Sequence, residues 1–157
     1  MMENEHLYHV VAWWSSGKSG LVKSDSAPNT IHFTAPLQFG GFEGRWSPED
    51  LLLAAVAGCY TTTFRAIAEY SKFEYTDLEV EARGVVRKAE SGYKFDGIVI
   101  RPTLTMSSEK EQPQACRLLE KAKQLCLISR TLSIALTYEP RVRIMAGAET
   151  GRAMLVE

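Results

Sequence analysis

The chain has three cysteines, Cys59, Cys116 and Cys126, and their thiols are its strongest candidates for chemistry. A cysteine thiolate can attack an electrophile, bind a metal or form a disulfide. The three positions form neither a Cys-x-x-Cys pair nor a zinc-ligand spacing. An odd number of cysteines favours reduced thiols over a framework of structural disulfides. The unreactive alternative is that each cysteine serves only as a small buried hydrophobe.

Cys59 lies in a stretch that predicts a long core helix. Ser47 is a suitable N-cap, Pro48 suits the first helical position, and the two carboxylates that follow complement the helix dipole. The run Leu51–Tyr60 carries no charge, so we expect it to be buried on every side. This run is too short to span a bilayer, which needs about 20 residues. The helix as a whole is predicted to end near residues 71–73.

A buried cysteine needs a lowered pKa before it can act as a nucleophile, because burial disfavours the thiolate. Cys59 lies about three turns inside its predicted helix, whereas the effect of the helix dipole fades within the first turn. We therefore expect a nearby cation to activate this thiol. The candidates are Lys18, Arg45 and Arg65. Each of them has an ordinary alternative as a solvated or ion-paired surface charge.

Cys126 is predicted to lie near the C-terminal end of a second, amphipathic helix. Ser107 or Ser108 can cap this helix, and Pro113 falls in its first turns, where the missing N–H is tolerated. Apolar residues then recur at three- and four-residue spacing up to the cysteine. They are Ala115, Leu118, Leu119, Ala122 and Leu125.

The other segments predict β-strands around the two core helices. Residues 78–86 alternate with period two, as a half-buried strand does. Further strands are predicted at 7–14, 21–24, 30–34, 93–106, 133–138 and 141–145. We expect a single α+β domain over residues 1–157, with a loose tail over 146–157.

The composition is that of an ordinary globular domain, 45% apolar and 24% charged. A net charge of −1 argues against nucleic acid or an anionic membrane as an obligatory partner. The segment 1–6 lacks a basic region followed by an apolar one, so we expect no signal peptide and a cytoplasmic location. The histidines, His6, His9 and His32, are too scattered to predict a metal site.

Two segments resemble the signatures of the OsmC/Ohr family (osmotically inducible protein and organic hydroperoxide resistance protein). The first is Ser47–Cys59, with the sequence Ser-Pro-Glu-Asp-Leu-Leu-Leu-Ala-Ala-Val-Ala-Gly-Cys. The second is Ala122–Leu132, which contains Cys126. A predicted β-hairpin lies between the two, as it does in the family. The resemblance covers nearly the whole chain.

The resemblance implies an OsmC-like fold, an intertwined homodimer and a thiol peroxidase for organic hydroperoxides. In such an enzyme Cys59 would be the peroxidatic cysteine, which becomes a sulfenic acid, and Cys126 the resolving cysteine, which closes a disulfide. Glu49 matches a carboxylate that holds a catalytic arginine. Cys116 matches no signature and is interpreted as structural. No bound cofactor is implied, and the reductant would be an external thiol or dithiol, such as a lipoyl group.

The chain departs from the family pattern at the activating arginine. In the hydroperoxide resistance branch this arginine lies in a Gly-rich turn after the first strand, where the present chain has Lys18. In the osmotically inducible branch it lies just before Phe-Glu-Gly, but here Gly41 precedes Phe42–Gly44 and the nearest arginine is Arg45. Lysine lacks the bidentate fork of a guanidinium. The order of preference for the cation is Arg45, Lys18 and then Arg65.

Three classes of function remain open. The first is the peroxidase. The second is a small-molecule binder or thiol-redox sensor with the same fold and weak or no peroxidase activity, and the third is a purely structural dimer. Several aromatic residues could wall an apolar substrate pocket, although core packing explains them nearly as well. These are Trp13, Trp14, Phe39, Phe42 and Trp46.

Overall fold

The computed structural model describes residues 4–145 and 154–156 of the chain. Its contacts divide the protein into two compact units, Met1–Leu52 (unit 1) and Leu53–Glu157 (unit 2). Each unit has its own β-sheet, and the helices are few, which confirms the predicted α+β class. A single domain over 1–157 stays a prediction.

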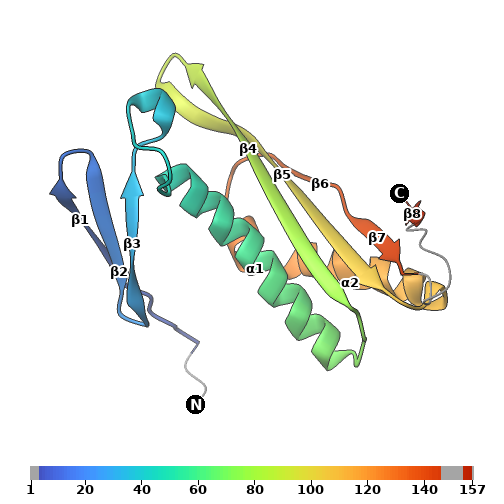
Figure 1. The fold of residues 1–157 in the computed structure, drawn as a ribbon. Coiled ribbons are helices and arrows are strands. Elements are labelled where there is room, and N and C mark those ends of the chain that lie inside the picture. Colours follow the sequence, from blue (N-terminus) through green and yellow to red (C-terminus); the bar gives the residue numbers. More distant parts are fainter. Residues whose placement is uncertain (1–3, 146–153, 157) are drawn as a thin grey trace. The chain divides into compact units, whose positions relative to one another are not determined.

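Unit 1 is built on an antiparallel three-stranded sheet in the order β1-β2-β3 (Figure 1). Its strands are β1 (Val10–Ser16), β2 (Ser19–Ser24) and β3 (Ala27–Thr34), followed by the short 3-10 helix η1 (Leu37–Phe39). Gly17 has φ 54° at the tip of the β1–β2 hairpin, a conformation that favours glycine. The three strands predicted for this part of the chain are thus found with somewhat shifted ends.

The helix α1 (Pro48–Tyr70) begins in unit 1 at the predicted N-cap. The Ser47 hydroxyl donates to Asp50 Oδ2 (2.8 Å) and accepts the Asp50 N–H (3.1 Å), while the Ser47 N–H also donates to Asp50 Oδ2 (2.9 Å). This reciprocal arrangement is a capping box with aspartate in place of glutamate. The helix ends close to the predicted position, where Lys72 has φ 51° and the Phe73 N–H bonds the Ala68 carbonyl.

Unit 2 contains a long β-hairpin with helices beside it (Figure 1). The hairpin strands are β4 (Asp77–Ala89) and β5 (Gly92–Met106), both close to their predicted bounds. Two short strands, β6 (Leu136–Tyr138) and β7 (Arg141–Ile144), pair with β5 in parallel, and β8 (Met154–Val156) pairs with β7. The prediction of a loose tail over 146–157 is wrong at β8, which forms a strand, and residues 146–153 and 157 lie outside the described part of the chain.

The second predicted helix is divided in the structure. The 3-10 helix η2 (Glu109–Glu111) leads into α2 (Gln112–Leu125), and a separate short helix, α3 (Leu127–Thr131), follows Cys126. Cys126 itself has extended backbone angles, φ −61° and ψ 110°. The predicted single helix up to Cys126 is therefore correct in its extent, but the sequence analysis missed the second helix that starts there.

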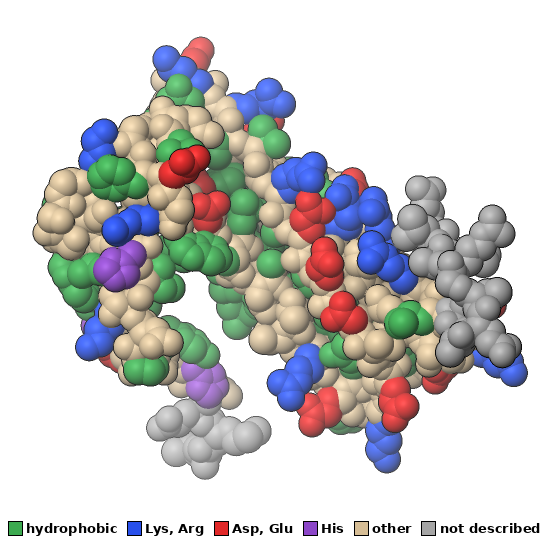
Figure 2. Space-filling model, in the orientation of Figure 1, with side chains coloured by type: hydrophobic (Ala, Val, Ile, Leu, Met, Phe, Trp, Pro, Cys, Tyr) green, Lys and Arg blue, Asp and Glu red, His purple; other side chains and the backbone are tan. Residues whose placement is uncertain are grey.

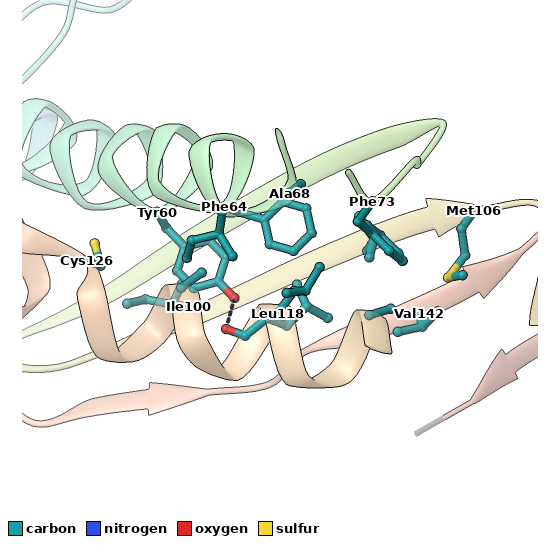
Figure 3. Close-up of a cluster of buried hydrophobic side chains, with 14 of the residues drawn as sticks. Tyr60, Phe64, Ala68, Phe73, Ile100, Met106, Leu118, Cys126 and Val142 are labelled. Carbon is teal, nitrogen blue, oxygen red and sulfur yellow. Dashed lines mark hydrogen bonds between the residues drawn. The ribbon is translucent and has the colours of Figure 1, made fainter. Parts of the chain in front are cut away.

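The core of unit 2 lies where α1 and α2 meet one face of β5. Tyr60 and Phe64 from α1, Ile100 from β5 and Leu118 from α2 pack together, as Figure 3 shows. The Tyr60 hydroxyl donates to the Leu119 carbonyl at 2.8 Å and so joins the two helices. Burying aromatic and branched side chains of this size stabilises a core by about 1.5–3 kcal/mol each.

The prediction that α1 is buried on every side is wrong for a single chain. Its buried residues, among them Val56, Tyr60 and Phe64, recur at four-residue spacing and so occupy one face. Ala55 and Ala66 are exposed. By length and composition, with a mean hydropathy of 1.5, α1 could cross a membrane, but the core helix of a soluble protein passes the same test. The chain's own elements cover only one side of this apolar helix.

Charged side chains of both signs are interspersed on the face drawn in Figure 2. In unit 2, for example, Arg101 pairs with Glu81 (2.7 Å) and Arg87 with Asp96 (2.8 Å) on the strands β4 and β5. Exposed pairs of this kind contribute at most about 1 kcal/mol each. The expectation that the protein has no nucleic acid partner stays a prediction.

Candidate thiol site

The fold brings Cys59 and Cys126 together, although 67 positions of sequence separate them. Cys59 lies in the middle of α1, and Cys126 joins α2 to α3. The two thiols are close enough that the Cys126 side chain lowers the pKa of Cys59. The backbone N–H of Ile128, two residues after Cys126, donates to Cys59 Sγ at 3.4 Å. Figure 3 places Cys126 at the end of α2 beside the core.

The break at Cys126 creates donors for Cys59. The Cys126 N–H bonds the Ala122 carbonyl (2.9 Å) and closes α2, while its carbonyl accepts the Arg130 N–H (3.1 Å) and opens α3. The first N–H groups of a helix have no partner inside that helix. Ile128 supplies one of these groups, and it points at the Cys59 sulfur instead of at water.

These contacts explain why Cys59 is the more acidic thiol. Burial raises the pKa of Cys59, but hydrogen bonds from the backbone of Ile128, the side chains of Cys126 and Thr63 and the backbone of Leu127 outweigh it, so that the pKa is lowered. Thr63 follows Cys59 by four residues and so lies on the same helix face. All of these groups are neutral donors. Neutral donors thus lower this pKa, and the expected activating cation stays a prediction.

Cys126 has the opposite character. It is fully buried, and burial raises the pKa of its thiol. A hydrogen bond from the Ser129 hydroxyl to Cys126 Sγ (3.2 Å) partly opposes this rise, whereas the neighbouring Cys59 adds to it. A half-buried thiol with a lowered pKa thus lies against a buried thiol with a raised pKa. This asymmetry suits a nucleophile and a second thiol held in reserve.

Two tyrosines, Tyr60 and Tyr138, flank the site, and both stay neutral. Burial raises the pKa of each. They also line a cavity of about 200 Å³ beside α2, where the exposed Cys116 lies. No contact in the described part of the chain ties Cys116 to the other two thiols, and its interpretation as structural stays a prediction. The described part of the chain contains no group of three or more His, Cys, Asp or Glu that could hold a metal ion.

Lys18, Arg45 and Glu49, which the sequence analysis assigned to the site, belong to unit 1. The Thr34 hydroxyl donates to the Lys18 carbonyl (2.8 Å) and accepts the Phe42 N–H (3.2 Å). It thereby joins the turn after the first strand to the loop that leads to Arg45. The two places where the family carries its arginine are thus neighbours in unit 1. Arg45 itself is exposed.

The carboxylate of Glu49 has an unusual environment. Its Oε2 atom is buried and has no hydrogen-bond partner in the described part of the chain. Burying an ionised carboxylate without a partner is costly, so this oxygen is suited to a cation or a hydrogen-bond donor. Lys18 Nζ lies next to Gly40, where an added β-carbon would come within 3.3 Å of it.

Arg65, the third candidate cation, does not face Cys59. Six residues along an α-helix correspond to a rotation of about 120° away from the starting face and a rise of about 9 Å. Arg65 is also exposed. The groups that the sequence analysis missed are Thr63, Ile128 and Ser129. Neither a glycine nor a proline marks the break at Cys126 in the sequence. The one local signal is Ser129, three residues after the cysteine, because serine is common in the capping segment of a helix.

A model of the OsmC-like protein family matches residues 41–140, which is more than half of the chain. The chain belongs to the OsmC-like family. The uncharacterized protein YmaD of Bacillus subtilis (strain 168) is 26% identical to this OsmC-like protein over an alignment of 145 residues, and the alignment covers 89% of the present chain and 97% of YmaD. The resemblance found in the two cysteine segments is thereby confirmed.

Solved structures share the fold of this OsmC-like protein. An OsmC-like protein of unknown function from Vibrio cholerae has a TM-score of 0.76 at 17% identity, covering 87% of this chain and 99% of its own. An organic hydroperoxide resistance protein OsmC from Legionella pneumophila has a TM-score of 0.69 at 24% identity, covering 88% and 98%. OhrB of Bacillus subtilis, an organic hydroperoxide resistance protein, has 0.63 at 22%, covering 86% and 98%. These likenesses confirm the predicted OsmC-like fold.

Proposed function

We propose that this OsmC-like protein is a dithiol peroxidase that reduces organic hydroperoxides. The observation that carries the proposal is the pairing of Cys59, whose pKa is lowered, with the buried Cys126, whose pKa is raised. A peroxidase of this type needs one thiolate and one adjacent thiol in reserve. The hydroperoxide resistance proteins of the same fold support the class of substrate.

In the first step the Cys59 thiolate attacks the terminal oxygen of the hydroperoxide. The O–O bond breaks, a sulfenic acid forms on Cys59, and the departing alkoxide takes a proton and leaves as the alcohol. The thiolate is the reactive form because a neutral thiol is a far weaker nucleophile. The N–H of Ile128 and the Thr63 side chain lower the pKa of Cys59 and so favour the thiolate.

In the second step Cys126 attacks the sulfur of the sulfenic acid. An S–S bond forms as the S–O bond breaks, and the hydroxide leaves as water with the proton of the Cys126 thiol. An external thiol or dithiol then reduces the disulfide by exchange and is itself oxidised. A lipoyl dithiol is the reductant we propose, because two linked thiols complete the exchange within one molecule. The protein needs no bound cofactor for this cycle.

Unit 1 is proposed to supply the substrate contacts. The five aromatic side chains that the sequence analysis named as pocket candidates are about half exposed, from 43% for Trp13 to 60% for Trp14, and offer an apolar surface for the organic group of the peroxide. Arg45 or Lys18 would stabilise the departing alkoxide, and Glu49 would hold that cation through its buried, unpartnered oxygen.

A second copy of the chain is proposed to cover what one chain leaves open. The exposed apolar face of α1 includes Ala55 and Ala66, and the sheet of unit 1 exposes large apolar side chains such as Trp14. Burying both would yield the intertwined homodimer that the OsmC/Ohr resemblance implies. The dimer is proposed to work in the cytoplasm, where thiol reductants are available.

The test is consumption of tert-butyl hydroperoxide by the purified protein, with dihydrolipoic acid in one series and glutathione in the other. We expect repeated turnover with the dithiol, slower turnover with the monothiol, and a preference over hydrogen peroxide. A protein that neither consumes the hydroperoxide nor oxidises Cys59 would refute the proposal.

The departure at Lys18 favours a second candidate, a thiol-redox sensor. Lysine gives a single point charge in place of a bidentate guanidinium, so the first step could be slow. A sensor would form one disulfide per equivalent of peroxide but would not turn over at a useful rate with either reductant. The same assay separates the two functions, because it measures both disulfide formation and turnover.

A further inference from the structure

Ser129 has no role in the proposed cycle, yet it is placed against the reserve thiol. It lies in α3, only 4% of its surface is exposed, and its hydroxyl donates to Cys126 Sγ at 3.2 Å. A buried hydroxyl usually satisfies a backbone carbonyl or another polar group. Here the Ser129 hydroxyl donates its one proton to a sulfur, which is a weak acceptor while the thiol is neutral.

A second hydroxyl lies behind the first. Tyr138, on β6, lies beside Ser129, whose side chain lowers the pKa of the Tyr138 phenol and partly opposes the effect of burial. A hydroxyl oxygen can donate once and accept from others, so Ser129 can accept the Tyr138 O–H while it donates to Cys126. β6 pairs with β5, where Tyr138 is in register with Ile100. The central sheet therefore fixes the position of the tyrosine.

We propose that Ser129 is a positioning residue for the resolving thiol, that Tyr138 orients it, and that the two hydroxyls stabilise the Cys126 thiolate as it attacks Cys59. This role rests on the proposed function, in which Cys126 closes the disulfide. The observed bond from Ser129 to Cys126 Sγ (3.2 Å) lies between Tyr138, which neighbours Ser129, and Cys59, which neighbours Cys126.

The physical reason lies in the burial of Cys126. A thiolate without donors is strongly disfavoured in such a place. A hydrogen bond to an ionised acceptor is about twice as strong as one to a neutral acceptor. The bond from Ser129 therefore strengthens as negative charge develops on Cys126, and an interaction that strengthens towards the transition state speeds the step.

The other titratable groups around Cys126 do not compete for this role. Cys59 is the group it attacks. Tyr60 on α1 gives its proton to the Leu119 carbonyl (2.8 Å). Lys123 lies over the ring of Tyr138, 5.2 Å from its centroid, and 3.5 Å from Glu120, so its charge faces a carboxylate outside the thiol pair.

The test uses disulfide closure without any peroxide, in full-length protein whose exposed Cys116 is replaced by serine. An aromatic disulfide, 5,5′-dithiobis(2-nitrobenzoate), is added in slight excess. The Cys59 thiolate breaks its S–S bond, forms a mixed disulfide and releases one coloured thiolate. Cys126 then attacks the Cys59 sulfur, the bond to the second aryl sulfur breaks, and a second coloured thiolate leaves. Stopped-flow absorbance resolves the two releases across a range of pH.

We expect Ser129→Ala to slow the second release roughly tenfold near neutral pH, the effect of losing a hydrogen bond to a charged group. Its rate–pH profile should move to higher pH, because the bond from Ser129 lowers the pKa of Cys126. The first release should stay within about twofold of the parent. Tyr138→Phe should slow the second release by about threefold, and Ser129→Thr should restore most of the loss.

Two matched variants remove a hydroxyl that does not touch Cys126. Thr131→Ala removes one from α3, where it donates to the Leu127 carbonyl at 2.9 Å. Tyr75→Phe removes one from a core tyrosine whose ring packs edge-on against Phe64. Both should close the disulfide at the parent rate. Far-UV circular dichroism shows whether each variant is folded. If Ser129→Ala is not folded, the rates of Tyr138→Phe and Ser129→Thr test the proposal instead.

A Ser129→Ala protein that closes the disulfide at the parent rate would overturn the proposal. A slower closure with an unshifted pH profile would do the same, since it would show a purely structural role. The absence of a second release in the parent would exclude Cys126 as the resolving thiol. A parent that closes the disulfide but does not consume hydroperoxide would refute only the proposed function, because the aromatic disulfide replaces the peroxide in this assay.

Discussion

The two units place their chemical groups in different ways. In unit 2 the thiols are fixed by packed helices, a buried core and hydrogen bonds, and Cys126 is fully buried. In unit 1 the buried side chains among the described residues are Ser19, Thr34 and Ser47, all of them polar, while its large apolar side chains are exposed. Unit 2 therefore sets the reactivity of the thiols by itself. Unit 1 lacks such a packed core among its described residues, and its proposed contacts with substrate depend on the proposed second copy of the chain.

The comparison predicts that substitutions in unit 2 decide whether the chemistry occurs, and that those in unit 1 change its rate. Cys59→Ser should have the largest effect and abolish hydroperoxide turnover. A serine hydroxyl has essentially no anion at neutral pH, so it cannot replace the thiolate. Intact mass after one equivalent of peroxide checks this, because the parent should lose two hydrogens and the variant none. An internal disulfide that forms without Cys59 would contradict the assignment.

Cys126→Ser should react once and then stall. Cys59 still becomes a sulfenic acid, but no neighbouring thiol is left to close the disulfide, and excess peroxide carries it to the irreversible sulfinic acid. The mass should therefore rise by oxygen where the parent loses hydrogen. Cys116→Ser is the matched control and should behave as the parent does. If the disulfide instead required Cys116, then Cys116 and not Cys126 would be the resolving cysteine.

The open face of α1 and the bare sheet of unit 1 predict an obligate dimer. Unfolding should then depend on protein concentration, because little folded monomer exists on its own. The measurement is the urea midpoint over a hundredfold range of concentration, together with the mass in solution. Ala55→Glu, which places a charge on the open face, should weaken association and lower the midpoint. A monomer mass with a midpoint independent of concentration would contradict the prediction.

The neutral donors around Cys59 predict a distinct pH dependence. Because they lower the pKa of Cys59, alkylation by iodoacetamide should persist to more acidic pH than for an ordinary thiol, and should fall as the pH drops through that pKa. In a Cys116→Ser background, Cys126→Ala and Thr63→Val should each move this profile to higher pH and slow alkylation near neutral pH by about threefold. Thr61→Val is the matched control, since its hydroxyl bonds the Ala57 carbonyl at 2.9 Å.

The sequence predicted the elements that carry the thiols but not the contacts between them. The capping residues Ser47 and Pro48 and the alternation in 78–86 are local signals, and the structure confirms the helix and the strand that they indicate. The activation of Cys59 is not local. It depends on the N–H of Ile128, and a backbone donor 69 positions away leaves no mark in the residue types. Charged side chains were the only activators of Cys59 that the residue types could indicate.

The comparison also predicts that the cations of unit 1 have the smallest effect on the chemistry. Because donors in unit 2 already lower the pKa of Cys59, the loss of a cation should slow hydroperoxide consumption by only about three- to tenfold. We expect the order Arg45→Gln, Lys18→Gln and, with almost no effect, Arg65→Gln, whose side chain lies on another face of α1. If all three variants stay within about twofold of the parent, no cation acts in the reaction.

A double-mutant cycle with Glu49→Gln identifies the partner of the buried carboxylate oxygen. If Glu49 holds the acting cation, removing both should cost little more than removing either, because each loss already breaks the pair. A cation whose loss adds its full effect to that of Glu49→Gln is then not the partner of Glu49. Alkylation of Cys59 in the same variants separates two roles for that cation. A change in hydroperoxide consumption without a change in the alkylation profile would place it at the departing alkoxide, whereas a shifted profile would show that it also stabilises the thiolate.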